Sequence, residues 1–183
     1  MKIVIGITGA SGSIFAVEFI KACSAEKYLI TTKWGKSVLA QETGLTIETL
    51  APHVKKVFSN EDISSPFASG SNPFDAMVIL PCSASTLSKI AYGFGDSLIT
   101  RVAGVALKEK RKLILCLRET PLSSIVIENM LKLSKEGAVI MPIAPSFYQK
   151  ADTVQEQASL FSSRVLQLIG LEIPSAGWKK EML

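Results

Sequence analysis

The chain has 183 residues, of which 48% are hydrophobic, and a formal net charge of +4 at pH 7. This length fits one domain with a large core, so we expect a single domain over residues 1–183, with its core at about 2–171 and a C-terminal tail at 172–183. No apolar run approaches the ~20 residues that cross a bilayer and the basic residues are dispersed, which excludes a membrane protein and a nucleic-acid-binding protein.

The N-terminal half of the chain alternates between strand and helix signals. A β-branched run at 2–8 ends in the turn Gly9-Ala10-Ser11-Gly12, after which apolar residues fall at helical spacing. The later signals in this half are a strand at 28–32, part of a helix at 38–43, and a strand at 77–80 that we expect Pro81 to stop. Such alternation predicts parallel strands joined by helices.

The C-terminal half continues the same alternation. The pattern is helical from 85 to 110 with a break near 93–96, and a buried strand at 112–117 is stopped by Arg118-Glu119-Thr120-Pro121. The remaining signals are an amphipathic helix at 125–135, a strand at 138–141, and a helix that opens with a capping box at 153–156 and runs to about 168. The sequence therefore predicts an α/β fold: a single Rossmann-like three-layer domain with a mostly parallel sheet and helices on both faces.

Three cysteines, Cys23, Cys82 and Cys116, lie far apart in apolar or helical contexts. Their spacing matches neither a zinc site nor a small disulfide framework. The first residues enter a strand directly, without the pattern of a signal peptide. We therefore expect a cytoplasmic protein with no metal site, and the excess of hydrophobic residues predicts contacts between subunits in addition to buried strands.

The turn Gly9-Ala10-Ser11-Gly12 follows the first strand and opens a helix. Small residues there let backbone N–H groups face an anion, which is typical of a phosphate site, although a plain structural turn has the same sequence. The Rossmann dinucleotide fingerprint is incomplete, because the glycines are out of its register and no acidic residue ends the second strand. A mononucleotide is therefore favoured over NAD.

Two further polar segments follow core strands and are expected at the same edge of the sheet. Ser83 and Thr86 offer hydroxyls at the start of a helix, with a simple helix cap as the alternative. Arg118 and Glu119 place a cation beside a carboxylate where open α/β sheets bind ligands, with a surface ion pair as the alternative. Arg118 can hold a phosphate through two parallel hydrogen bonds, and Glu119 can act as an acid.

Four more polar side chains are candidate site residues, but their sequence signals are weaker. Arg101 and Lys108 lie seven residues apart on a predicted helix, so they share a face and can address one anion, or they are ordinary solvated charges. Tyr148 and Arg164 are single polar residues to which the sequence pattern alone assigns no role. His53, the only histidine, follows a proline and is expected at the surface.

Eight short segments occur together in this chain. They are Gly9-Ala10-Ser11-Gly12, Pro81-Cys82-Ser83-x-x-Thr86-Leu87, Leu98-Ile99-Thr100-Arg101, Leu107-Lys108-Glu109, Arg118-Glu119-Thr120-Pro121, Glu128-Asn129-Met130, Gly137-Ala138-Val139-Ile140 and Phe147-Tyr148. In order and spacing they resemble the UbiX family of flavin prenyltransferases from residue 2 to about residue 171. Their joint occurrence is far more specific than any one motif.

The resemblance implies a homododecameric flavoprotein. Members of this family join a dimethylallyl group from dimethylallyl phosphate to N5 and C6 of reduced FMN, and they use no metal. The product, prenylated FMN, is passed to a partner decarboxylase of the UbiD type. The reaction sheds a phosphate dianion, which clustered arginine, lysine and tyrosine donors would stabilise.

The same resemblance assigns roles to residues at matching positions. FMN would be held by Gly9, Ala10, Ser11, Thr32, Ser83, Ala84, Ser85, Thr86 and Arg118. The prenyl phosphate would be held across a subunit interface by Arg101, Lys108, Arg118, Tyr148 and Arg164. The catalytic residues would be Glu119, which protonates the leaving phosphate, and Glu42 with Ser11, which manage the flavin proton.

The chain departs from the family's pattern in places, including Gln149 after Tyr148 where the family has proline, and two other functions stay open. Gly104 stands where the family commonly has aspartate, and Ile63 stands where some members have tryptophan. One alternative is an FMN-dependent decarboxylase of the same fold, which is expected to need a histidine near the flavin, whereas His53 lies in the wrong region. The other is a non-catalytic flavin carrier that docks to a decarboxylase.

Overall fold

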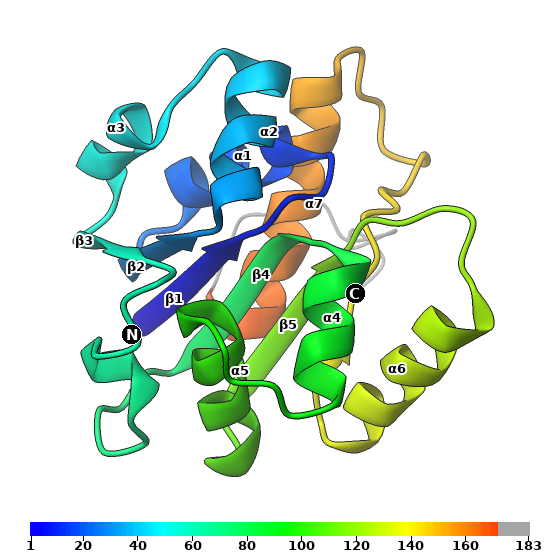
Figure 1. Cartoon of the computed structure of the whole chain (residues 1–183). Helices are drawn as coiled ribbons and strands as arrows, with labels where there is room; N and C mark the ends of the chain where they lie inside the picture. Colours follow the sequence, from blue (N-terminus) through cyan, green and yellow to red (C-terminus); the bar gives the residue numbers. More distant parts are fainter. Residues whose placement is uncertain (172–183) are drawn as a thin grey trace.

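A computed structural model of the chain describes residues 1–171. Six strands form one sheet in the order β3-β2-β1-β4-β5-β6, and every neighbouring pair is parallel (Figure 1). The strands are β1 (Lys2–Ile7), β2 (Glu26–Thr31), β3 (Lys56–Ser59), β4 (Ala76–Cys82), β5 (Lys112–Leu117) and β6 (Val139–Ile140). The predicted α/β fold is confirmed, and the sheet that was expected to be mostly parallel has only parallel pairs in the part described.

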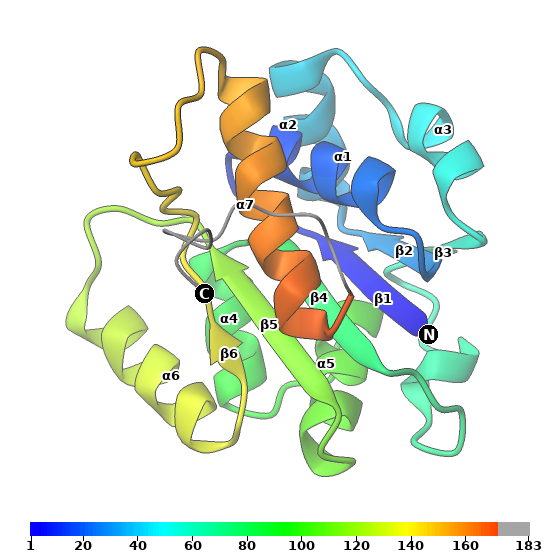
Figure 2. The same ribbon diagram turned by 180° about the vertical axis from the view of Figure 1, so that it is seen from behind.

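Helices cover both faces of the sheet and make three layers (Figures 1 and 2). One face carries α1 (Ser13–Ala22), α2 (Lys33–Thr43) and α7 (Val154–Ile169). The other face carries α4 (Ala84–Ala91), α5 (Leu98–Lys108) and α6 (Ser124–Lys135). Shorter helical turns are α3 (Ile47–Leu50), η1 (Ala51–His53) and η2 (Pro66–Ala68).

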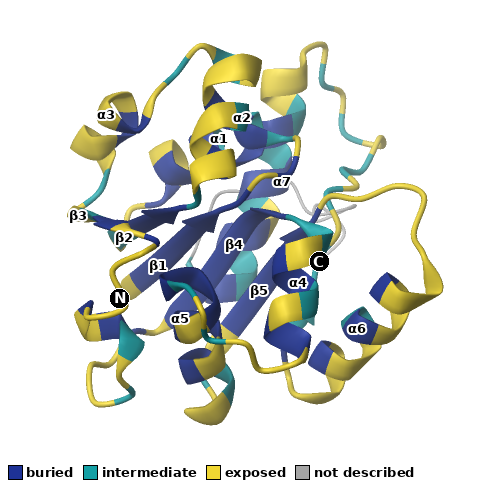
Figure 3. Ribbon diagram, viewed as in Figure 1, coloured by how far each residue is buried: buried dark blue, intermediate teal, exposed yellow. Residues whose placement is uncertain are grey.

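The central strands are apolar because both of their faces are covered. Along β1, Ile3, Ile5 and Ile7 pack against the α1 and α7 side, whereas Val4 packs against the α5 side. All seven residues of β4 are buried, and Figure 3 shows the central strands as a continuous buried layer. This explains why the strands read as continuous hydrophobic runs in the sequence instead of alternating with polar residues.

The order of the strands creates a switch point between β1 and β4. From β1 the chain first adds β2 and β3 on one side, and it later adds β4, β5 and β6 on the other side. The connections that leave β1 and β4 therefore diverge, and open α/β sheets bind ligands in the crevice outside the carboxyl ends of such strands. The glycine turn after β1 and the serine turn after β4 flank this crevice.

Three local features differ from the sequence prediction. Pro81 does not stop β4, which runs on to Cys82 after an irregularity in its pairing with β5. A proline has no N–H to donate, and an irregular point in the ladder tolerates that loss. β3 and α3 were not predicted, because each is too short to give a clear periodic signal.

The serine- and proline-rich segment at 60–75 packs onto the fold through aromatic residues. Phe67 and Phe74 are buried, and the ring of Phe67 meets those of Tyr28, Phe58 and Phe74 with centroids 4.8 to 5.8 Å apart. Ile63 stays exposed. The predicted tail at 172–183 lies outside the described residues, and no helix within them is long and apolar enough to cross a bilayer.

Candidate functional site

Thr8 joins the carboxyl ends of β1 and β4. Its hydroxyl donates to the Pro81 carbonyl at 2.8 Å and accepts from the backbone N–H of Ser83, also at 2.8 Å. The backbone N–H of Thr8 donates to the same carbonyl at 3.2 Å. Because Thr8 is buried, these bonds are shielded from water and fix the serine turn beside the glycine turn. Sequence analysis missed this residue, although a hydroxyl at the end of a buried strand was a usable signal.

Glu42 caps the N-terminus of α1 from the neighbouring helix α2. Its carboxylate accepts from the backbone N–H of Gly12 at 3.0 Å and from that of Ser13 at 2.8 Å. Gly12 has a φ of 102°, a left-handed conformation that suits glycine, and this turns both N–H groups toward the carboxylate. The helix N-terminus that was expected to face a phosphate is therefore occupied by a side chain of the protein itself.

The pKa of the Glu42 carboxyl lies below its ordinary value. Partial burial pushes the pKa upward, but hydrogen bonds from the Ser11 side chain and from the backbone N–H groups of Ser13 and Gly12 outweigh it. Glu42 is therefore a carboxylate at neutral pH, next to the hydroxyl of Ser11.

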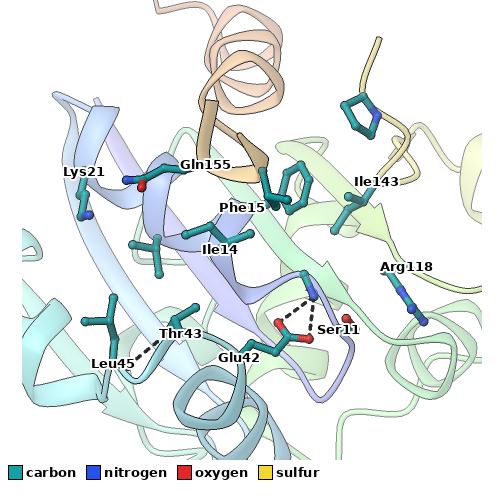
Figure 4. A pocket seen from close by; sticks show the side chains of 14 residues that line it. Ser11, Ile14, Phe15, Lys21, Glu42, Thr43, Leu45, Arg118, Ile143 and Gln155 are labelled. Carbon is teal, nitrogen blue, oxygen red and sulfur yellow. Dashed lines mark hydrogen bonds between the residues drawn. The ribbon is translucent and has the colours of Figure 1, made fainter. Parts of the chain in front are cut away.

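A cavity of about 770 Å³ opens beside this cap (Figure 4). Ser11, Glu42 and Arg118 all line it, although they come from the β1–α1 turn, from α2 and from the end of β5. Ile14, Phe15 and Ile143 supply apolar walls. The cavity thus combines the carboxylate of Glu42, the cations of Lys21 and Arg118 and the hydroxyls of Ser11 and Thr43 with apolar surface, which is the composition of a small-molecule site.

The N-termini of α2 and α4 lie at the carboxyl ends of β2 and β4, and each is capped by a hydroxyl side chain. Thr32 caps α2 by accepting from the N–H of Gly35 at 2.9 Å, and Ser83 caps α4 by accepting from the N–H of Thr86 at 3.2 Å. The first N–H groups of a helix have no partner inside the helix, so those of α4, which include Ala84 and Ser85, suit a phosphate.

Gly9 allows close approach between the glycine turn and α2. A Cβ at Gly9 would lie 2.5 Å from Cβ of Trp34, which is closer than two carbon atoms can pack. Trp34 itself is 68% exposed. The glycine is therefore required by packing against Trp34, in addition to any contact with a ligand, and Trp34 is a second residue that sequence analysis missed.

Arg118 and Glu119 follow β5 at the same edge of the sheet. The backbone N–H of Arg118 donates to the Cys82 carbonyl at 3.0 Å, which ties the end of β5 to the end of β4. Both side chains are exposed, and Glu119 accepts from the backbone N–H of Thr120 at 3.0 Å. Glu119 does not line the cavity that Arg118 enters.

The remaining predicted cations lie elsewhere in one copy of the chain. Arg101 and Lys108 line a second cavity of about 370 Å³ on α5. Arg164 is exposed on α7, which covers the opposite face of the sheet, and donates to Oε1 of Gln167 at 3.1 Å. Tyr148 is exposed in the segment between β6 and α7. A single copy therefore brings together Ser11, Glu42 and Arg118 but does not bring the five predicted phosphate ligands together.

No three histidine, cysteine, aspartate or glutamate side chains gather as a metal site within residues 1–171. His53 lies in η1, just before the amino end of β3, and so at the edge of the sheet opposite to the crevice. Its position agrees with the prediction that it is not a catalytic base near the ligand. The three cysteines are buried, and burial raises the pKa of Cys82 to about 12.

Comparisons with known proteins identify the family. Residues 1–162 match the Flavoprotein family. The flavin prenyltransferase UbiX of Thermoplasma acidophilum is 43% identical over 172 residues, which cover 93% of this chain and 96% of the relative.

Two solved structures have the same fold over nearly the whole chain. AnUbiX (PadA1), in complex with FMN and dimethylallyl pyrophosphate, has a TM-score of 0.93 and 36% identity, and the match covers 97% of this chain and 98% of that one. A dodecameric FMN-dependent UbiX-like decarboxylase from Escherichia coli O157:H7 has a TM-score of 0.92 and 37% identity, with coverage of 97% and 99%. The resemblance seen in the sequence is confirmed: the chain belongs to the Flavoprotein family and, within it, to the UbiX-type flavin prenyltransferases.

Proposed function

We propose that this chain joins a dimethylallyl group from dimethylallyl phosphate to N5 and C6 of reduced FMN and so makes prenylated FMN. The observation that carries the proposal is the shared cavity of Ser11, Glu42 and Arg118 at the switch point of the sheet. The structure of the relative AnUbiX, which holds FMN together with dimethylallyl pyrophosphate, supports the pair of ligands.

The residues at the switch point fit FMN in one orientation. The carboxylate of Glu42 already fills the N-terminus of α1, so it repels a phosphate and leaves this end of the site to the uncharged flavin ring. The phosphate then lies at the N-termini of α2 and α4, which present N–H groups and hydroxyls. The FMN ligands in this proposal are Gly9, Ala10, Ser11, Thr32, Ser83, Ala84, Ser85, Thr86 and Arg118.

Ser11 and Glu42 manage the proton of the flavin. Reduced FMN, when bound, supplies the nucleophile and much of the π surface that shelters an allylic cation. Glu42, which is an ionised carboxylate, accepts a proton through or beside the Ser11 hydroxyl. The apolar walls of the cavity exclude water, which would otherwise capture the cation.

The leaving phosphate is held by residues of more than one copy. Arg101, Lys108, Arg118, Tyr148 and Arg164 stabilise its developing charge, and Glu119 protonates it. Because α5 and α7 lie on opposite faces of the sheet, these ligands meet only if copies assemble. The Escherichia coli relative, which is described as dodecameric, supports a homododecamer.

The remaining parts of the proposal concern the setting of the reaction. The product is delivered to a UbiD-type decarboxylase, and both proteins work in the cytoplasm.

The mass of the flavin after reaction tests the proposal. The protein is incubated anaerobically with reduced FMN and dimethylallyl phosphate, and the released flavin is analysed by mass spectrometry. Prenylated FMN is the expected product. Recovery of unmodified FMN alone would contradict an enzyme and favour a flavin carrier.

A further inference from the structure

Phe147 lies in the segment that joins β6 to α7. Its side chain is 86% exposed, more than any other large apolar side chain in the part of the chain that is described. The segment is held at both ends: the N–H of Ile143 donates to the Leu117 carbonyl at 2.8 Å, and the N–H of Asp152 donates to Oε2 of Glu156 at 2.6 Å. Aromatic rings that fill a pocket in a partner supply much of the binding energy of an interface, so Phe147 is a candidate for such a contact.

The second cavity, which we call the α5 recess, has room for an aromatic ring. Its volume is about 370 Å³, and it lies between α5, the loop that joins α4 to α5, and η2. A cavity of about 150 Å³ holds a benzene ring, so this recess accommodates a phenylalanine side chain together with part of the adjoining backbone. Ile90, Phe94 and Val105 form apolar walls. The recess thus offers apolar contacts to a ring that enters it.

Gly104 keeps the α5 wall of the recess open. It lies in the middle of α5, where glycine weakens a helix. Apart from the backbone of α5 and the two adjacent residues, no atom of residues 1–171 lies within 4 Å of the position that a Cβ would take, and φ is not left-handed. Neither packing within the chain nor backbone conformation therefore requires glycine here. A side chain of another molecule that packs closely against α5 would require it.

Arg101 adds a cation to the same recess. Its side chain lies along the loop wall, since a Cβ at Gly95 would stand 3.2 Å from Nε of Arg101. No acidic side chain of residues 1–171 forms an ion pair with Arg101. A guanidinium group is attracted to the face of an aromatic ring and stacks on it. The recess therefore favours an aromatic side chain over an aliphatic one of similar size.

Phe147 and the α5 recess lie too far apart to meet within one copy. Phe147 lies in the segment that leads into α7 on one face of the sheet, whereas Ile90 and Val105 of the recess pack on the other face. Figures 1 and 2 show this segment in the upper part of the molecule and α5 in the lower part, in both views. A contact between them therefore joins two copies. It is head-to-tail, because each copy presents its ring to one neighbour and its recess to another.

We propose that Phe147 of one copy inserts into the α5 recess of a second copy and packs over Gly104, with Arg101 against the face of the ring. The contact uses two different surfaces, so it repeats from copy to copy until a ring of copies closes. The inference goes beyond the proposed function, which names an oligomer but no contact between Phe147 and the recess. It assigns Phe147 and Gly104 a part in assembly and none in the transfer of the prenyl group, so it can fail while the proposed reaction stands.

Photo-cross-linking of the full-length protein locates the ring. Phe147 is replaced by p-azidophenylalanine, which keeps the aromatic ring, and the assembled protein is irradiated and digested with trypsin. Cleavage after Lys89, Arg101 and Lys108 releases peptides 90–101 and 102–108, which carry most of the recess. We expect cross-links from residue 147 to these two peptides in the gel band that contains two copies. Cross-links to other segments only, or none between copies, would overturn the inference.

Substitutions on each side of the contact test it through the mass of the assembly, measured by light scattering over a dilution series without prenyl donor. Phe147→Ser removes the ring, and Gly104→Leu fills the recess with a side chain of its own. Each should raise the concentration at which half of the copies are assembled by about tenfold or more, as loss of a central aromatic contact does. Gly104→Ala adds only a methyl group and is the control that should stay near wild type. Wild-type assembly of folded Phe147→Ser would contradict the contact even if Gly104→Leu does not fold, and circular dichroism establishes which variants are folded.

A mixture of the two variants tests whether ring and recess contact each other. The ring of a Gly104→Leu copy can enter the intact recess of a Phe147→Ser copy, whereas the reverse contact is lost on both sides. Mixed pairs with one copy of each variant should therefore form in excess over the pairs that each variant forms alone. Native mass spectrometry distinguishes these pairs, because the two variants differ in mass. Mixed pairs in no excess would show that Phe147 and the recess act at separate surfaces and would overturn the inference.

Discussion

The hydroxyl of Thr8 accepts a hydrogen bond of 2.8 Å from the backbone N–H of Ser83, 75 residues later in the chain. Through this bond the first strand positions the turn that follows the fourth. In Thr8→Val the shape is kept but the N–H of Ser83 loses its acceptor, which should cost about 1–3 kcal/mol of stability. Thr8→Ser retains the hydroxyl and is the control. Chemical denaturation of the two variants checks this, and equal stability would show that the bond contributes little.

Substitutions of Gly9 and Trp34 should have strongly non-additive effects on the stability of the fold. In Gly9→Ala the new methyl carbon meets Cβ of Trp34 at 2.5 Å, so α2 must shift, at a cost of about 1–3 kcal/mol and with weaker binding of FMN. Trp34→Ala keeps the Cβ and should not relieve the clash, whereas Trp34→Gly removes it and should. A double-mutant cycle based on melting temperature measures this difference. If Trp34→Ala and Trp34→Gly reduce the destabilisation by Gly9→Ala equally, then the indole ring, and not Cβ, causes the clash.

The cap made by Glu42 should depend on pH. Because the pKa of Glu42 is lower in the folded chain, the carboxylate stabilises the fold above the ordinary pKa of glutamate, about 4.3, and this stabilisation is lost as pH falls through the lowered value. Glu42→Gln should therefore lower the melting temperature at pH 7, and the difference from wild type should shrink below about pH 4. A difference that stays constant down to pH 3 would contradict the role of charge in the cap.

Glu119→Gln tests the acid in the proposed reaction. The glutamine keeps the size of the side chain and loses the proton, so FMN should remain bound while turnover falls by about 10²–10⁴-fold. The carboxylate of Glu119 accepts a hydrogen bond from the backbone N–H of Thr120. The amide oxygen of the glutamine in the variant can accept the same bond, so the loop should keep its shape. The absorption of bound flavin and the rate of prenylation are the two measurements. Unchanged turnover would remove Glu119 from the mechanism.

Tyr148→Phe and Arg164→Ala test two of the proposed ligands of the prenyl phosphate. Each should raise KM for the prenyl donor, because each removes one donor to the phosphate, and should leave the affinity for FMN near the wild-type value. Arg164→Lys keeps the charge without the planar fork and should lie between wild type and Arg164→Ala. Loss of FMN from either variant would instead place the residue in the flavin site.

Much of the fold was predictable because its core strands are long, apolar and separated by clear turns. The run at 112–117 and the capping box at Thr153 both occur in the structure as the sequence indicated. The prediction that Pro81 ends the strand was wrong, because the hydrogen bonds to the neighbouring strand decide whether a proline ends a strand. Those hydrogen bonds cannot be read from the local sequence. The order of strands was also beyond local signals, because pairing between distant segments sets it.

The site was predictable in its parts more than in its arrangement. The turns at Ser11 and Arg118 were found because each follows a core strand, and the sheet does bring them to one cavity. The cap formed by Glu42 was not foreseen as a structural contact, because it joins two helices through side-chain geometry. Arg101 and Arg164 illustrate the remaining gap, since a match of motifs does not say which face of the sheet carries each residue.

The sheet separates two groups that the proposed reaction brings together, Arg101 on α5 and Arg164 on α7. With α5 on one side and α7 on the other, no hinge or loop closure inside a single polypeptide can unite their arginines. The rate of the proposed reaction per subunit should then depend on the fraction of subunits that are assembled. Dilution below the dissociation constant of the oligomer should stop turnover although every subunit stays folded. In the proposed mechanism, a substitution that breaks the contact between neighbouring copies would then stop turnover even where the flavin site of each copy is intact.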